Sequence, residues 1–260
     1  MSFKSRHHKE KIIIRHTDNK KQPLTVKIST HLQANIDHLQ LLFDQPDDLK
    51  IRKITFSNTA IEGIIVFFEG LVQPLSVQQG ILTNLELNKT FPDTSDDLFQ
   101  FIYTHCIAIN DVQKTQTFDD VSAKLLAGYT AIFIDGVSEA LIINTIGGEY
   151  RAIEEPVTET LIRGSRTGFV ENIETNVALI RRRARDPNLR FQTHIAGKRS
   201  QTNIVVAYID DIIDPKILKE VNRRLKSIDI DIIPESGYIE EWIEDSFLSP
   251  FPQILNTERP

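Results

Sequence analysis

Residues 163–190 read RGSRTGFVENIETNVALIRRRARDPNLR, and this stretch predicts a helix with one apolar face. Its apolar residues recur at steps of three or four positions, the spacing of a helix that packs on a core; they are Phe169, Ile173, Val177, Ile180 and Ala184. Glutamates occupy the first turns and arginines the last ones, in keeping with the helix dipole. Asp186-Pro187 then ends the helix.

Four arginines crowd the end of this helix: Arg181, Arg182, Arg183 and Arg185. The dipole favours one or two cations there, so the larger cluster indicates a surface that meets negative groups. Exposed decoration, a salt-bridged interface between domains or subunits, and an anionic ligand or nucleic acid all remain open. We assign the arginines to an interface in which they pair with carboxylates. The available partners are Glu171, Asp186, Glu240, Glu241, Glu244 and Asp245.

The sequence aligns with itself when it is shifted by 141 positions. The shift places Leu32 on Ile173, Asn35 on Asn176, Pro46 on Pro187, Glu69 on Asp210 and Pro74 on Pro215. Both copies read as amphipathic helix, proline stop, strand, polar loop, apolar strand, acidic turn and proline-started helix. The sequence therefore predicts an α/β protein of two similar tandem subdomains related by an internal repeat, each a small sheet packed with helices.

The repeat also predicts where the elements lie. The strands are expected at 51–56 and 61–68 in the first copy and at 189–195 and 204–209 in the second. In the first copy alone, a helix at 118–127 and a hairpin turn at Asp135-Gly136 follow. The second copy stops where its own helix and hairpin would begin. We therefore expect the sequence to belong to a longer protein.

Three regions follow from these patterns. We expect a basic, disordered arm at 1–27, the first α/β subdomain at 28–150 and the second at 151–260. A polybasic arm could attract an anionic membrane surface or nucleic acid, although a solvated tail is the simpler interpretation. The paired Asn35 and Asn176 are expected to anchor neighbouring loops through their amides, and the paired Phe101 and Trp242 are expected in the core.

Composition narrows the class of protein. The 260 residues are 40% hydrophobic and 25% charged, with a formal net charge of −6, which is typical of a globular protein. The single cysteine, Cys106, excludes an internal disulfide and a cysteine-rich zinc site. No apolar run approaches the roughly 20 residues that a membrane helix needs.

The sequence carries no motif of known catalytic chemistry. It contains no G-x-G-x-x-G, P-loop, H-E-x-x-H or G-x-S-x-G pattern, so we expect no catalytic residue, no metal site and no cofactor. The carboxylates of Asp210, Asp211 and Asp214 could ligate a cation. Their counterparts in the first copy are Glu69, Gly70 and Gln73, which favours a solvated turn instead.

The motif around the arginine helix resembles the soluble N-terminal domain of the A subunit of bacterial spore germinant receptors, the GerA family. The family pattern is G-x-x-x-G-F-x-E, then N, then an arginine-rich run that ends in D-P-x-L. Here it corresponds to Gly164, Gly168 to Glu171, Asn176, Arg181 to Arg185 and Asp186 to Leu189. A second block agrees over 238–245, 249–253 and 256–260, whereas residues 28–112 match only loosely.

The resemblance implies a role in the nutrient sensing that triggers spore germination, without enzymatic chemistry. It implies B and C receptor subunits and other A subunits as partners. It also implies attachment to the spore inner membrane through a following membrane region, with this domain on the cytoplasmic, spore-core side.

The ligand is the open question that the resemblance raises. An amino acid, sugar or nucleoside germinant could bind in a crevice between the two lobes, for which Gly70, Asp210 and Asp211 are the candidate residues. A scaffold that assembles receptor subunits without binding a ligand is one alternative. A tandem nucleic-acid-binding module is another, and the net charge of −6 opposes it, so we expect no nucleic acid as a partner.

Overall fold

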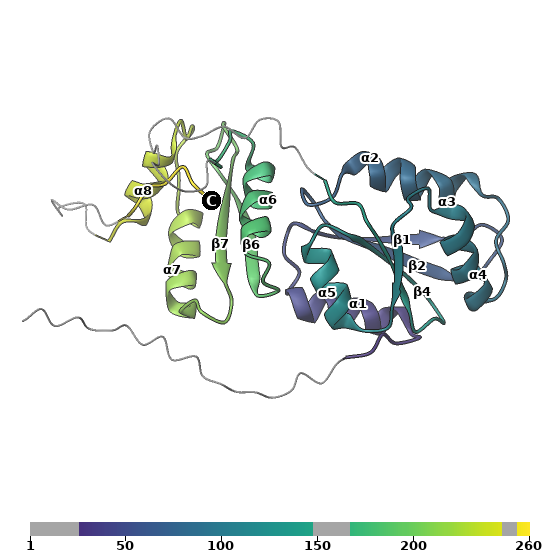
Figure 1. Ribbon diagram of the computed structural model, residues 1–260. Helices are drawn as coiled ribbons and strands as arrows, with labels where there is room; N and C mark the ends of the chain where they lie inside the picture. The colour runs from purple at the N-terminus through teal and green to yellow at the C-terminus, as the bar shows by residue number, and fades with distance from the viewer. Residues whose placement is uncertain (1–25, 148–166, 246–253) are drawn as a thin grey trace, which may run out of the picture.

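The computed structural model describes residues 26–147, 167–245 and 254–260, which form two α/β subdomains (Figure 1). The predicted boundary near residue 150 and most of the predicted arm lie outside the described residues. The last two residues of that arm, however, belong to the first subdomain. Lys27 forms a β-bridge with Thr117, and the amide of Phe118 donates to the carbonyl of Val26 at 2.9 Å.

The first subdomain is built on a five-stranded antiparallel sheet in the order β1-β2-β4-β5-β3. The strands are β1 (Leu49–Thr55), β2 (Glu62–Phe68), β3 (Val112–Thr115), β4 (Thr130–Ile134) and β5 (Ala140–Ile143). The central strands are apolar on both sides because helices cover both faces of the sheet. The β4–β5 turn contains Gly136 at φ 89, a conformation that glycine adopts without strain.

Helices form a layer on each face of this sheet. They are α1 (Leu32–Phe43), α2 (Pro74–Val77), η1 (Gln78–Leu82), α3 (Thr83–Leu87), α4 (Ser95–Phe101), η2 (Ile102–Cys106) and α5 (Phe118–Leu126). Residues alternate between two cores along β2: Ile64 and Val66 pack with α1 and α5, and Ile65 packs with α2 to α4. The result is a three-layer sandwich in which the sheet is buried.

The second subdomain is smaller and contains a single hairpin. Its elements are α6 (Ile173–Arg183), β6 (Leu189–Ala196), β7 (Thr202–Ile209), α7 (Pro215–Lys226) and α8 (Ser236–Ile243). The side chains of Asn172 and Asp214 cap the starts of α6 and α7, accepting from the amides of Thr175 at 2.9 Å and Lys216 at 2.8 Å. In Figure 1, α6 lies between the first subdomain and the hairpin, with α7 on the opposite side.

The two subdomains share the predicted order of helix, hairpin and helix, and the predicted fold class is confirmed. The side-chain amide of Asn35 makes two hydrogen bonds with the backbone of Ser29, of 2.8 and 2.7 Å. Asn176 makes the same two bonds with the backbone of Val170, also of 2.8 and 2.7 Å. The second helix differs, being one helix α7 in the second copy and the broken α2-η1-α3 in the first. The internal repeat as the origin of this likeness stays a prediction.

The core position expected for Trp242 is wrong. Its side chain is 36% exposed, and no residue of α8 is buried. The corresponding helix α4 buries its apolar residues against a sheet that includes β4 and β5, whereas α8 packs on helix α7. The same helical pattern therefore gives different burial in the two copies because the two helices pack on different neighbours.

Candidate functional site

Arg181 joins the two subdomains through a buried ion pair. Its side chain is fully buried, and its guanidinium makes a two-pronged ion pair with Asp48: Nε donates to Oδ2 at 2.8 Å and Nη2 donates to Oδ1 at 2.8 Å. Nη1 donates to the carbonyl of Leu189 at 3.2 Å. Asp48 lies just before β1 of the first subdomain and Arg181 lies in α6 of the second. This pair is therefore a contact between subdomains.

Two aromatic rings enclose the guanidinium of Arg181. The ring of Phe68 lies 4.5 Å from its Cζ, and the ring of Phe191 lies 4.9 Å away. One phenylalanine comes from each subdomain and both are buried, so the guanidinium is shielded from solvent in an environment of low dielectric constant. Burial raises the pKa of the Asp48 carboxyl, and the hydrogen bonds and charge of Arg181 oppose that rise. Breaking such a pair leaves an uncompensated buried charge.

Arg182 makes a second tie between the subdomains through backbone oxygens. Its Nη2 donates to the carbonyl of Gly70 at 2.9 Å and to the carbonyl of Gly147 at 2.6 Å. Gly70 has φ 78, and a Cβ at this position would lie 2.8 Å from the Cβ of Ala178 in α6. Gly70 thus allows α6 to approach the first subdomain closely. Gly70 therefore has a packing role in the structure, and its predicted role in ligand binding stays a prediction.

The loop before β1 also accepts a hydrogen bond from the edge of β6 that faces away from β7. The amide of Thr193 donates to Oδ2 of Asp47 at 2.8 Å. Nearby, the buried guanidinium of Arg190 lies 3.8 Å from Asp44 and 4.0 Å from Asp210. The contact between subdomains therefore combines charge pairs, backbone hydrogen bonds and apolar packing.

Of the remaining predicted residues, Arg183, Arg185 and Asp211 lie apart from this contact, and Asp210 lies at its edge. The exposed Arg183 donates to the carbonyl of Pro260. Arg185 is exposed and makes no hydrogen bond or ion pair with the described residues. Asp210 lies beside Arg190, and Asp211 is an exposed turn residue. Nothing in the described part of the chain brings Asp210 or Asp211 together with Gly70 as a ligand site.

The carboxylate partners expected for the arginines were wrong for Arg181. Its partner is Asp48, which lies 133 positions earlier in the sequence, and Asp245 of the predicted acidic segment pairs with Arg224 instead, at 2.6 Å. Asp186 accepts from the amide of Asn188, within its own turn, at 2.8 Å. The partners expected from the sequence lie near the helix or towards the C-terminus, whereas Asp48 lies in the first subdomain. The one available signal for Asp48 was its position two residues after Pro46 and directly before a strand.

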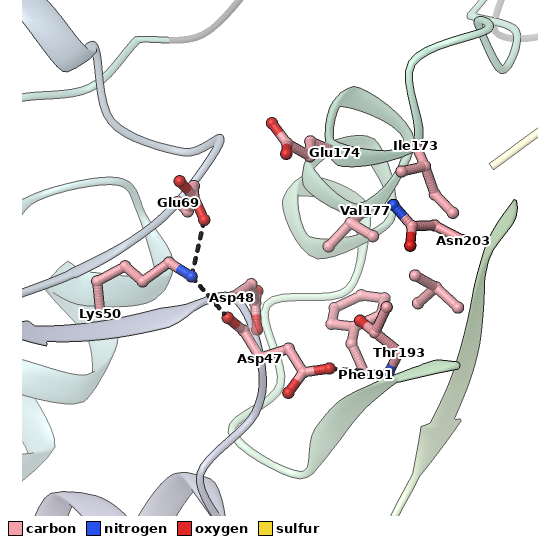
Figure 2. Close-up of a pocket in the computed structure, with 11 residues that line it drawn as sticks. Asp47, Asp48, Lys50, Glu69, Ile173, Glu174, Val177, Phe191, Thr193 and Asn203 are labelled. Carbon is pink, nitrogen blue, oxygen red and sulfur yellow. Dashed lines mark hydrogen bonds and ion pairs between the residues drawn. The ribbon is translucent and has the colours of Figure 1, made fainter. Parts of the chain in front are cut away.

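A cavity of about 210 Å³ lies beside the Arg181–Asp48 pair (Figure 2). Its apolar wall comes from the second subdomain and consists of Ile173, Val177, Phe191 and Val205. Its charged wall comes from the first subdomain, where Nζ of Lys50 lies 2.9 Å from Oε2 of Glu69 and 3.1 Å from the carbonyl of Asp47. The exposed Glu174 completes the rim.

The described residues contain neither a cluster suited to a metal ion nor a helix suited to span a membrane. No group of three or more histidine, cysteine, aspartate or glutamate side chains is placed to hold a metal ion within residues 26–147, 167–245 and 254–260. Within those same ranges, no helix has the length and apolar character required to cross a bilayer.

Comparison with known proteins gives relatives in spore germination. The spore germination protein GerLA of Bacillus cereus is 45% identical over 215 residues, covering 83% of this chain and 43% of that protein. The spore germination protein KA of Bacillus subtilis is 36% identical over 236 residues, covering 90% of this chain and 43% of that protein. The membrane protein YfkQ of Bacillus subtilis, which is uncharacterized, is 39% identical, covering 94% of this chain and 46% of that protein. The chain thus spans less than half the length of these relatives.

A solved structure and a family model agree with these relatives. The crystal structure of the N-terminal domain of the A subunit of the Bacillus megaterium spore germinant receptor GerK3 matches with a TM-score of 0.65 and 27% identity, covering 90% of this chain and 86% of that one. The model of the Bacillus/Clostridium GerA spore germination protein family matches residues 37–260. None of these comparisons points to a family of enzymes. The chain belongs to the GerA family of spore germination proteins.

Proposed function

We propose that this chain is the N-terminal region of a germinant receptor A subunit and acts as a rigid two-lobed unit that couples nutrient sensing to the membrane part of the receptor. The observation that supports the rigid coupling role most strongly is the buried Arg181–Asp48 ion pair between the lobes. In the full-length protein, this region faces the spore core at the inner membrane, and B, C and other A subunits contact it. It performs no chemistry.

The contact between subdomains opposes hinge motion. Separating the lobes would expose the guanidinium of Arg181 and the carboxylate of Asp48, which are paired and buried, together with two aromatic rings. It would also break the two hydrogen bonds of Arg182 and the close packing of Gly70 on Ala178. A force applied to one lobe therefore moves the other with it, which is the property that a coupling element needs.

Two arginine variants test the coupling role in spores. Arg181→Met removes the buried ion pair, and Arg185→Met is the matched control because Arg185 lies in the same arginine cluster and is exposed. We expect R181M spores to lose optical density more slowly after nutrient is added, and R185M spores to respond as the parent does. Receptor levels are measured by immunoblot in both. A normal response from R181M spores that contain normal receptor levels would refute the coupling role.

The cavity beside the ion pair supports a second function, direct binding of a small germinant. An apolar wall faces an ammonium and carboxylates across about 210 Å³, which is the arrangement that a small molecule with an apolar body and a charged head requires. Amino acids, sugars and nucleosides titrated into the isolated chain test this function by amide chemical shifts. Shifts at Lys50 and Val177 that Val177→Asp abolishes support it, and unchanged spectra at millimolar concentration leave the chain a coupler alone.

A further inference from the structure

We propose that helix α7 binds an anionic membrane surface through a stripe of basic side chains on its outer side. The stripe consists of four exposed residues, Lys216, Lys219, Arg223 and Lys226. They follow one another at steps of three, four and three positions, so their side chains lie along one side of the helix. This surface is separate from the contact between the subdomains, and its role does not depend on a germinant.

The basic stripe faces away from the body of the second subdomain. The opposite side of α7 carries Leu218, Val221 and the buried Leu225, which follow the same helical spacing. Beside them, the amide of Asn222 donates to Oε1 of Gln192 in β6 at 3.1 Å, so this side packs on the hairpin. In Figure 1, α7 lies on the far side of the hairpin from α6 and the first subdomain. The stripe therefore forms part of the outer surface.

The fold does not require this positive charge. Helix α7 contains five basic residues and one acidic residue. The helix at the same place in the first subdomain, after the β1–β2 hairpin, is α2-η1-α3, and Glu86 is its only charged residue. Lys216 also lies in the first turn of α7, where the helix dipole disfavours a cation. Basic residues that folding does not require are expected where a surface binds something negative.

Most of this charge is available to an external anion. Arg223 and Arg224 share Glu220, with nitrogen to oxygen distances of 2.7 Å, and the side chain of Arg223 remains 65% exposed. The three lysines of the stripe make no ion pair with the described residues. The stripe thus keeps its positive charge at the surface.

Exposed isoleucines at the start of α7 favour a lipid surface over nucleic acid. Ile212, in the turn before the helix, is 75% exposed, and Ile217 is 58% exposed. At a bilayer, apolar side chains enter the boundary between headgroups and acyl chains while lysines and arginines meet the anionic headgroups. The phosphate backbone of a nucleic acid attracts the same lysines but offers no apolar layer to the isoleucines. The membrane setting rests on the proposed function, whereas the charge and the exposed isoleucines are features of this part of the chain.

The expected strength of binding follows from the charges. Each basic residue near an anionic leaflet makes binding about fivefold tighter, so neutralising the three lysines should weaken it roughly 100-fold. The net charge of the chain is −6, so an anionic surface attracts the protein only when the stripe is turned towards it. Binding should also disappear in about 1 M salt, where screening shortens the reach of a charge to about 3 Å.

Co-sedimentation of residues 1–260 with lipid vesicles tests this inference. One set of vesicles contains phosphatidylglycerol and phosphatidylcholine in equal parts, and the other contains phosphatidylcholine alone. Thermal unfolding followed by circular dichroism checks that each variant is folded. The test variant is Lys216→Gln/Lys219→Gln/Lys226→Gln. The control variant removes the same total charge at exposed positions elsewhere and is Lys53→Gln/Lys89→Gln/Arg185→Gln.

The parent and the control variant should bind the phosphatidylglycerol vesicles alike, and the test variant should bind them roughly 100-fold more weakly. None of the three should bind phosphatidylcholine alone with comparable strength. Equal binding of all three to phosphatidylglycerol would place the attraction elsewhere, such as on the basic residues of 1–27, and would overturn the inference. A parent protein that binds neither set of vesicles would overturn it as well.

A further variant separates a lipid surface from other polyanions. Ile212→Ser should weaken binding to the phosphatidylglycerol vesicles roughly threefold and leave any binding to double-stranded DNA unchanged, because only a bilayer buries this side chain. If I212S binds the vesicles as the parent does, and the parent binds DNA through the same three lysines, the stripe is a general polyanion site and the inference is wrong. These measurements involve neither a germinant nor the coupling of the lobes, so the proposed function and this inference fail separately.

Discussion

Replacing Arg181 by methionine should destabilise the protein more than any change to the other three arginines of its cluster. The substitution keeps most of the side-chain volume but removes both hydrogen bonds to Asp48, each 2.8 Å long, and the bond to the carbonyl of Leu189. Asp48 then stays buried without a counter-charge. Removing one partner of a buried pair costs about 3–5 kcal/mol of the free energy of unfolding.

The pH dependence of this loss follows from the Asp48 carboxyl. Burial raises its pKa above the ordinary 3.8 in the native protein, and Arg181 opposes that rise. In Arg181→Met the opposition is gone, so the pKa rises further. A raised pKa means that the native state favours the neutral carboxyl, so the deficit of R181M should shrink as the pH falls towards 4 and grow as it rises through the new pKa.

Urea denaturation of the isolated chain, followed by circular dichroism, measures this loss. Arg185→Met is the control and should stay within about 0.5 kcal/mol of the parent because Arg185 is exposed. The double variant Arg181→Met/Asp48→Asn should lose less than R181M, since the buried negative charge is gone. If R181M and R185M unfold at the same urea concentration, the buried pair does not join the subdomains in solution and the reasoning fails.

Three further predictions concern packing, side-chain anchoring and charge. Gly70→Ala should cost about 1–3 kcal/mol in thermal unfolding, because a Cβ there would lie 2.8 Å from that of Ala178, and Ala178→Gly should restore part of it; an unchanged melting temperature would contradict the close approach. Asn35→Ala should lower the free energy of unfolding by about 1–3 kcal/mol and Asn176→Ala by less, because Asn35 is 1% exposed and Asn176 is only partly buried; equal losses would show that burial does not set the cost. Arg223 and Arg224 of the same helix lower the pKa of Glu220 to about 2 from 4.5, so its ¹³C carboxyl shift should titrate near pH 2. The stability that this carboxylate contributes is present above pH 4.5 and is lost as the pH falls towards 2. A titration near pH 4.5 would show that the ion pairs do not persist in solution.

Local patterns were sufficient to predict several elements of the fold, although they did not predict strand β3. The stripe from Ile173 to Ala184, the proline at Pro187 and the apolar runs of the hairpins predicted α6, β1, β2, β6 and β7 to within a few residues. The roles of Asn35 and Asn176 were also readable, because each amide acts on backbone six residues away. These features depend on residues that are neighbours in sequence, and such interactions leave a periodic trace.

The tertiary structure alone decided which arginine matters and what it contacts. Arg181 and Arg185 are the same residue type four positions apart, yet one is fully buried on Asp48 and the other is exposed. No local pattern distinguishes them, because burial is set by how α6 lies against the first subdomain. Gly70 was a candidate for ligand approach, and the fold brings Ala178 of α6 against it, a contact between distant segments that the sequence does not reveal. Contacts between residues more than 100 positions apart depend on how separate elements dock, and the sequence records the elements but not their docking.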